Sequence, residues 1–192
     1  DLMPLMITDW RNRWGYDFPF YMVQLASFTA KQTAPVESTW AELREAQTRT
    51  LHLQNTGMAG AIDIGEGFDI HPKNKQDVGK RLAALSLADT YRKGTYHMPV
   101  CTGYKVYDRT LALAFDSPVQ ANAGEVKGFV LAGPDGVFYP AKATLQQNGK
   151  SVVLESPQVE IPIAARYNWA DCPNGNLYSP SGVPVGPFRT DK

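Results

Sequence analysis

The chain has 192 residues, 43% hydrophobic and 20% charged, as is ordinary for a globular protein with one large core or two small ones. Its 19 lysines and arginines balance 19 aspartates and glutamates, so no basic excess favours nucleic acid as a partner. The sequence has no run of about 18 apolar residues, which argues against a membrane-spanning helix. Any export signal is expected to have been removed or to lie upstream. Cys101 and Cys172 follow no metal-ligand spacing, and their pairing cannot be read from the sequence.

The first predicted element is a short helix with an apolar face. Leu2, Met6, Trp10 and Trp14 recur every four residues, which places them on one side of a helix. We expect both tryptophans in the core. The sequence starts at Asp1 without an initiator methionine and leads directly into this amphipathic segment, as if the chain began within a fold.

Two buried strands with a helix between them are predicted next. Residues 20–25 form a continuous apolar run of strand length, typical of a strand buried on both faces. Thr39 and Glu42 make a capping box at the start of a helix that should run through Thr50. Residues 57–63 are a second apolar run that ends on a carboxylate, as a strand of a parallel sheet would deliver it to the sheet edge.

A third helix follows, in which Asn74 can cap the N-terminus and Leu82 and Leu85 share a face, as far as about Tyr91. The order helix, strand, helix, strand, helix is typical of a parallel sheet covered by helices. Two strands are too few for an independent sheet, so we expect further strands from sequence before Asp1.

Beyond about residue 95 the hydrophobic period falls toward two, which predicts strands. The hairpin turns at 134–136 and 148–149 supply the glycine and asparagine that positive φ requires. Seven short strands predict a β-sandwich, and a coil is expected from Asp171 onward. We therefore divide the chain into 1–95, the C-terminal part of an α/β domain with a parallel sheet, and 96–192, a β-sandwich domain. The expected strands are 104–107, 110–115, 127–132, 137–139, 143–146, 151–154 and 163–169.

Of the three histidines, His71 is the candidate for chemistry. It lies between the strand that ends at Asp63 and a capped helix, where an α/β sheet exposes its active-site edge. A histidine base for acyl transfer needs an acceptor that orients its second ring nitrogen, and Asp69 and Asp63 are both candidates. A metal site made of these three residues is disfavoured because no second histidine stands nearby. His52 and His97 are interpreted as structural.

Several other polar and aromatic side chains could contact a substrate but are interpreted as structural. Gln24, Arg44 and Gln47 are expected to hydrogen-bond near the site. The aromatic side chains within 166–169 are expected to pack between domains rather than to stack on sugar.

Residues 57–65 and 69–82 resemble the histidine block of the sialate O-acetylesterase family of SGNH (GDSL-like) hydrolases. The resemblance implies a flavodoxin-like α/β catalytic domain with β-sandwich appendages, and serine-dependent hydrolysis of acetyl esters on a sugar or glycan. It further implies no metal or organic cofactor and no membrane partner, with a secreted or periplasmic location inferred from the substrate. Similar stretches cover nearly the whole chain: 5–11, 19–26, 40, 43–47, 128–136, 166–170, 176–178 and 187–190.

In this resemblance His71 matches the catalytic histidine, which takes the proton of the serine and returns it to the sugar alkoxide. The family places aspartate three residues before the histidine, but Phe68 stands there. Asp69 is therefore the expected orienting carboxylate, and Asp63 remains open.

The serine block and the oxyanion donors of the superfamily have no counterpart in the sequence. We therefore expect the serine on an upstream segment of the same protein, without which this chain should be inactive. The rival interpretation is a non-catalytic carbohydrate-binding or accessory chain, and the acetylated sugar is not specified. The serines that were considered and lack a Gly-x-Ser-x context are Ser27, Ser38, Ser86 and Ser117.

Overall fold

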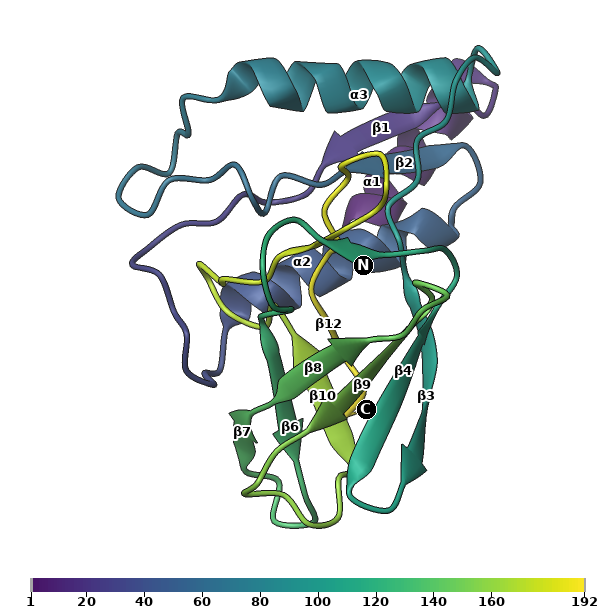
Figure 1. The fold of residues 1–192 in the computed structure, drawn as a ribbon. Coiled ribbons are helices and arrows are strands. Elements are labelled where there is room, and N and C mark those ends of the chain that lie inside the picture. Colours follow the sequence, from purple (N-terminus) through teal and green to yellow (C-terminus); the bar gives the residue numbers. More distant parts are fainter. Residues whose placement is uncertain (1, 192) are drawn as a thin grey trace.

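The computed structural model describes residues 2–191. Helices and two parallel strands occupy one end of the molecule, and antiparallel strands make up the other (Figure 1). Strands β1 (Phe20–Val23) and β2 (Thr56–Ala59) pair in parallel, joined by helix α2 (Thr39–Arg49) and the short 3-10 helix Thr50–His52. This is a strand, helix, strand unit of the kind the alternation predicts.

Both faces of this strand pair are covered. Helix α3 (Lys75–Asp89) lies on one face, where Leu85 fills the space next to Gly57 and the ring of Tyr21. On the other face Met22 and Met58 form a small core with residues from outside the α/β layers. The two strands are thus covered on both faces, as a buried parallel pair requires.

The helix caps are set by short polar side chains. Asn74 caps α3, as predicted, through a 3.1 Å bond from the main-chain N–H of Asp77 to Oδ1. Helix α2 is capped by Ser38 rather than by Thr39, because the Ser38 hydroxyl accepts the N–H of Ala41 at 2.9 Å. The helix boundary therefore lies one residue before the predicted capping box.

The prediction that the tryptophans of the first helix are core residues is wrong. Helix α1 (Leu2–Trp14) buries Ile7 and Arg11, whereas Trp10 and Trp14 are 45% and 73% exposed. Arg11 explains which face is turned inward, because its guanidinium donates to the carbonyl oxygens of Phe18 and Asn55. The face that the four-residue period picks out is therefore largely exposed within residues 2–191, although the ring of Trp10 contacts that of Phe20, with 6.1 Å between ring centres.

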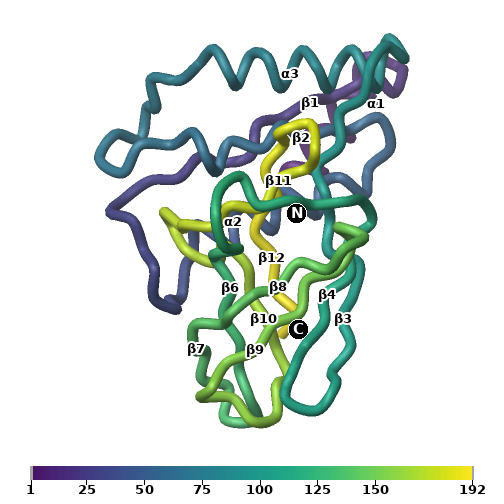
Figure 2. Tube along the Cα trace, viewed as in Figure 1, coloured from purple at the N-terminus to yellow at the C-terminus, as the bar shows by residue number. Residues whose placement is uncertain are grey.

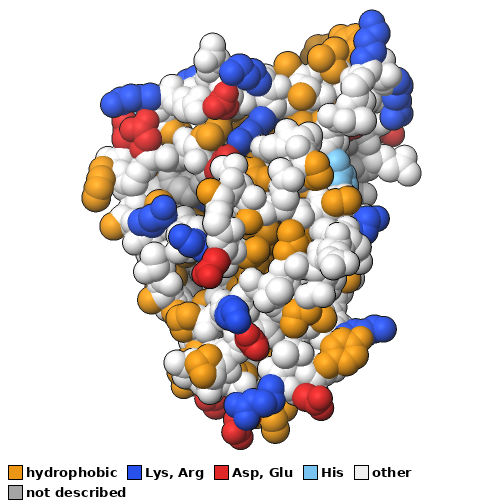
Figure 3. Space-filling view, viewed as in Figure 1, with side chains coloured by type: hydrophobic (Ala, Val, Ile, Leu, Met, Phe, Trp, Pro, Cys, Tyr) orange, Lys and Arg blue, Asp and Glu red, His pale blue; other side chains and the backbone are white. Residues whose placement is uncertain are grey.

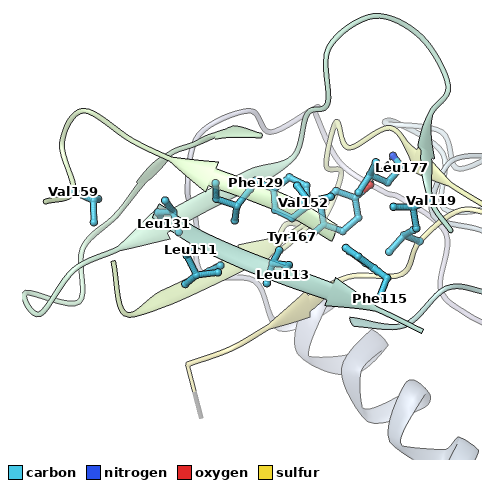
Figure 4. Packing of buried hydrophobic residues seen from close by; sticks show 13 residues of the cluster. Leu111, Leu113, Phe115, Val119, Phe129, Leu131, Val152, Val159, Tyr167 and Leu177 are labelled. Carbon is cyan, nitrogen blue, oxygen red and sulfur yellow. Dashed lines mark hydrogen bonds between the residues drawn. The ribbon is translucent and has the colours of Figure 1, made fainter. Parts of the chain in front are cut away.

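The antiparallel part is built from two four-stranded sheets. Their inward side chains form one core, in which Leu111, Leu131, Val152 and Tyr167 are fully buried (Figure 4). One sheet has the order β3 (Cys101–Tyr107), β4 (Thr110–Phe115), β9 (Ser151–Glu155), β8 (Lys142–Leu145). The other has the order β12 (Phe188–Arg189), β10 (Ala164–Tyr167), β6 (Phe129–Ala132), β7 (Phe138–Pro140).

All seven strands predicted after residue 95 are present, with ends displaced by up to three residues. Three two-residue strands were not predicted: β12 and the pair β5 (Gln120–Ala121) and β11 (Leu177–Tyr178). β11 and β12 lie in the stretch from Asp171 that was expected to be coil. Such short strands carry no periodicity that a sequence could reveal.

The fold is mixed α/β. Its antiparallel sheets lie after residue 95, where the sequence predicts a β-sandwich. The parallel sheet has two strands within residues 2–191, so the larger flavodoxin-like sheet is not shown. None of the helices in the described part of the chain is long and apolar enough to span a bilayer. Acidic and basic side chains are interspersed over the face drawn in Figure 3, in keeping with the zero net charge.

Candidate active site

Two loops leave the same edge of the parallel pair. Because β1 and β2 run in parallel, the segments that follow them, 24–38 and 60–74, start side by side. This edge is where α/β sheets bind their ligands. His71 lies on the second loop and is exposed.

The loop that carries His71 is ordered by its own side chains. Oε1 of Glu66 accepts the main-chain N–H of Lys73 at 2.7 Å, and Oδ1 of Asp69 accepts the main-chain N–H of His71 at 2.8 Å. Asn74 then starts α3. In this loop, side-chain oxygens thus take the place of the main-chain carbonyls that would accept these N–H groups in a helix. The position of the His71 main chain is therefore fixed by local hydrogen bonds.

The same loop rests directly on the segment that follows β1. A Cβ atom at Gly65 would lie 2.1 Å from the carbonyl oxygen of Ser27, and one at Gly67 would lie 2.8 Å from that of Thr29. The Ser27 hydroxyl donates to the carbonyl of Ile62 at 2.5 Å. Only glycine permits so close an approach of two main chains. The two loops therefore form one body at the sheet edge.

A buried arginine of α2 holds the first of these loops. Arg44 is fully buried and donates to the carbonyl oxygens of Leu25 and Ala26, each at 2.9 Å. Its remaining donors reach the carbonyls of Ala170 (2.8 Å) and Asp171 (2.9 Å) in the antiparallel part. Burial lowers the pKa of Arg44 to about 10, although the charge of Asp171 opposes the shift.

Arg44 thus joins the loop after β1 to the segment after β10. Its planar guanidinium presents five N–H groups in fixed directions, which suits four carbonyls on two segments better than an ammonium would. Gln47 supports the same loop, because its Oε1 accepts the N–H of Leu25 at 3.0 Å. These contacts agree with the interpretation of Gln24, Arg44 and Gln47 as structural, since Gln24 is also fully buried and bonds to Thr48.

Asp63 is engaged elsewhere than at His71. Both of its oxygens accept from Arg81, at 2.6 and 2.7 Å, and the Tyr178 hydroxyl donates to Oδ2 at 3.3 Å. The two ion-paired side chains are only 14% and 15% exposed, although the main chain leaves Asp63 at the surface. Burial, together with the nearby Asp63 charge, raises the pKa of Tyr178 to about 12.

The structure therefore separates the two candidate carboxylates. Asp69 is bonded to the main chain of His71. Asp63 instead joins the segment after β2 to α3 through Arg81 and to β11 through Tyr178. A contact between the Asp69 carboxylate and the His71 ring stays a prediction. The role of Arg81 was not predicted, because a lone arginine eighteen residues from its partner gives no sequence signal. The close main-chain approach was not predicted either, although the two glycines Gly65 and Gly67 are a signal for it.

The remaining candidates have structural surroundings. His52 Nδ1 lies 2.6 Å from the carbonyl of Arg49, and His97 Nε2 lies 3.0 Å from Oδ2 of Asp116. Cys101 and Cys172 are both free thiols. Within residues 2–191 no group of three or more His, Cys, Asp or Glu side chains is arranged to hold a metal.

Aromatic side chains of segment 166–169 pack inside the protein. Tyr167 belongs to the sandwich core, and Trp169 is buried beneath the guanidinium of Arg189, 4.4 Å from the ring centre. This agrees with the packing role expected of them.

Comparison with known proteins gives an informative match among solved structures. No model of a protein family matches the chain, and no curated protein matches it. Among solved structures, a carbohydrate acetylesterase from Xanthomonas citri is 41% identical with a TM-score of 0.91, over 99% of this chain and 45% of that one. An S-layer protein is 9% identical with a TM-score of 0.38, over 98% of this chain and 21% of its own, which is too weak a likeness to carry any argument. The chain is thus a structural relative, over nearly its whole length, of a carbohydrate acetylesterase of which it spans less than half.

Proposed function

We propose that this chain is part of a carbohydrate O-acetylesterase of the sialate O-acetylesterase type, within the SGNH hydrolases, and that His71 is its catalytic base. The observation that carries the proposal is the 41% identity to a carbohydrate acetylesterase together with an exposed histidine on an ordered loop at the sheet edge. The substrate would be an acetylated sugar or glycan, and the location secreted or periplasmic.

In the proposed reaction the His71 imidazole removes the proton of a serine hydroxyl as the oxygen attacks the acetyl carbonyl. The imidazolium then returns the proton to the departing sugar oxygen, which leaves an acetyl-serine that water hydrolyses by the same steps. Asp69 would orient the ring from its place on the same loop. Its carboxylate has two oxygens, and Oδ1 alone is used by the His71 main chain, so Oδ2 remains for this task.

The serine is proposed to lie on another stretch of the same protein, N-terminal to the part described here. Two features support a docked segment. The apolar face of α1 is largely exposed, with Trp10 45% and Trp14 73% exposed, and large exposed apolar patches mark interaction sites. β1 pairs within residues 2–191 only with β2, which leaves room for a further strand beside it. The preceding segment would complete a flavodoxin-like sheet along this edge.

The proposal is tested by p-nitrophenyl acetate hydrolysis with the full-length protein and its His71→Ala variant. A base in acyl transfer contributes roughly 10²–10⁴-fold to the rate, so kcat should fall by about this factor. His52→Ala is the matched control, since His52 bonds to the main chain of its own helix end. Equal kcat in His71→Ala and wild type would reject the assignment.

A further inference from the structure

A cavity lies beside the loops of the candidate active site. It encloses about 470 Å³ between segment 32–37 and the sheet that contains β6, β7 and β10. Figures 1 and 2 both show the segment before α2 descending between the loop that joins β2 to α3 and strand β7. The walls combine aromatic rings with amide and charged groups, contributed among others by Pro35, Glu37, Phe138, Arg166, Asn168 and Trp169.

Arg166 is the fixed cation of this cavity. Its Nε and Nη2 both donate to Asp191, the shortest bond being 2.7 Å, and its guanidinium lies 4.1 Å from the ring centre of Phe138. The Arg166 side chain is almost fully buried. Bidentate pairing and stacking hold a guanidinium in one orientation. Arg166 therefore presents its third nitrogen, Nη1, in a fixed direction.

The partner of Nη1 is replaceable. Nη1 donates to Oε1 of Glu37 at 2.9 Å, but the Glu37 side chain is 81% exposed and comes from the segment on the other side of the cavity. Because the Glu37 carboxylate is exposed to water, its bond to Arg166 should contribute less to stability than the pair with Asp191. An incoming carboxylate could take the position of Glu37 without any change at Asp191.

Two further features favour an anionic sugar over a neutral one. Lys127, which is exposed, also lines the cavity and forms no ion pair with any residue between 2 and 191, so it adds positive charge at the cavity. Phe138 and Pro35, which are half-buried, add apolar surface of the kind that sugar-binding pockets present.

The cavity and the His71 loop share a wall. Residues 27–29 touch the loop that carries His71, and residues 32–37 of the same segment line the cavity. The cavity therefore lies next to the loops of the candidate active site.

We propose that this cavity binds a uronic acid unit of the glycan, with its carboxylate replacing Glu37 on Nη1 of Arg166. The ligand is thus an acidic polysaccharide, and its identity as the esterase substrate rests on the proposed function. The carboxylate of the sugar gains the charge-assisted bond that Glu37 gives up.

The test measures binding by isothermal titration calorimetry with the full-length protein. The probes are trimers of galacturonate and of glucuronate, with cellotriose as the neutral trimer. A uronate trimer should bind at least about tenfold more tightly than cellotriose, and added salt should weaken its binding. Glu37→Gln should increase the uronate affinity severalfold, because the competing carboxylate is removed.

Glu160→Gln is the matched control, since Glu160 is equally exposed and also pairs with an arginine, Arg109. It should leave the affinity unchanged. The proposal is overturned if neither uronate binds wild type or Glu37→Gln, if cellotriose binds as tightly, or if the two glutamate variants have the same affinity. Binding is read without ester hydrolysis, so these results and those with p-nitrophenyl acetate succeed or fail independently.

Discussion

Gly65 lies so close to Ser27 that a Cβ atom at position 65 would sit 2.1 Å from the Ser27 carbonyl oxygen. This contact joins the loop that carries His71 to the loop that Arg44 holds. Main-chain atoms cannot move aside as a flexible side chain can, so the contact fixes the distance between the two loops.

Gly65→Ala should therefore displace the His71 loop. Relieving such an overlap costs about 1–3 kcal/mol, and a shift of about 1 Å in a catalytic group can lower the rate about 10²-fold. We expect kcat for p-nitrophenyl acetate to fall by about that factor, while circular dichroism shows a folded protein. Gly79→Ala is the control, because a Cβ at this helical position meets nothing within 4 Å and should stabilise α3. Wild-type kcat in Gly65→Ala would contradict the positioning role.

Arg44 should be required for stability rather than for contact with substrate. Arg44→Ala removes four hydrogen bonds. Trp40 and the main-chain N–H of Phe28 still donate to the carbonyls of Ala26 and Asp171, so the carbonyl oxygens of Leu25 and Ala170 lose their donor, at about 1–3 kcal/mol each. We expect the free energy of unfolding, measured by urea denaturation, to fall by at least about 3 kcal/mol.

Arg44→Lys should lose less, because an ammonium has three donors and can keep some of these bonds. Arg13→Ala serves as the control, since it removes only an exposed pair with Asp9, and it should not change the urea midpoint. A variant Arg44→Ala as stable as wild type would refute the account of the four bonds.

Asp69 has two separable roles, one toward the main chain of His71 and one proposed toward its ring. Asp69→Asn keeps an acceptor for the His71 N–H but removes the negative charge, whereas Asp69→Ala removes both. If Asp69 orients the ring, Asp69→Asn should already lower kcat by about 10²-fold or more. Full activity in Asp69→Asn with low activity in Asp69→Ala would instead assign Asp69 to loop capping alone.

Asp63→Asn provides the comparison with the second carboxylate. It breaks the bidentate pair with Arg81 and should lower the free energy of unfolding by about 1–3 kcal/mol. Because Asp63 is bonded to Arg81 and Tyr178 rather than to His71 or Asp69, kcat measured below the unfolding transition should stay near wild type. A larger loss of kcat in Asp63→Asn than in Asp69→Asn would reverse the assignment of the orienting residue.

The Tyr178 hydroxyl should lose its proton at a higher pH than a free tyrosine does. Its pKa is raised to about 12 by burial and by Asp63, against about 10 for a free tyrosine. The folded protein therefore holds the proton more tightly than the unfolded chain does. The resulting stabilisation is complete below about pH 10 and is lost as the pH rises toward about 12.

The measurement is the ultraviolet absorbance of tyrosinate in wild type minus that in Tyr178→Phe. The difference curve should have its midpoint near pH 12. Circular dichroism must show that the protein is still folded up to that pH. A midpoint near the value of free tyrosine would show that the Tyr178 hydroxyl is not held beside Asp63.

Local patterns in the sequence determined most elements of the fold. The period of two located seven strands after residue 95, because each has an inward face that must be apolar. Asn74 identified the start of α3, because a cap acts within one turn of its helix. The place of His71 after a buried strand and before this cap identified its loop as an exposed one at the sheet edge.

Only the tertiary structure decided which partners these residues have. The sequence could not show that Asp63 pairs with Arg81, that Asp69 bonds to the main chain of His71, or that Arg44 bonds to a carbonyl 126 residues away. The same limit explains the error at Trp10 and Trp14. A four-residue period states that a helix has an apolar face, but whether that face is covered depends on what the rest of the fold places against it.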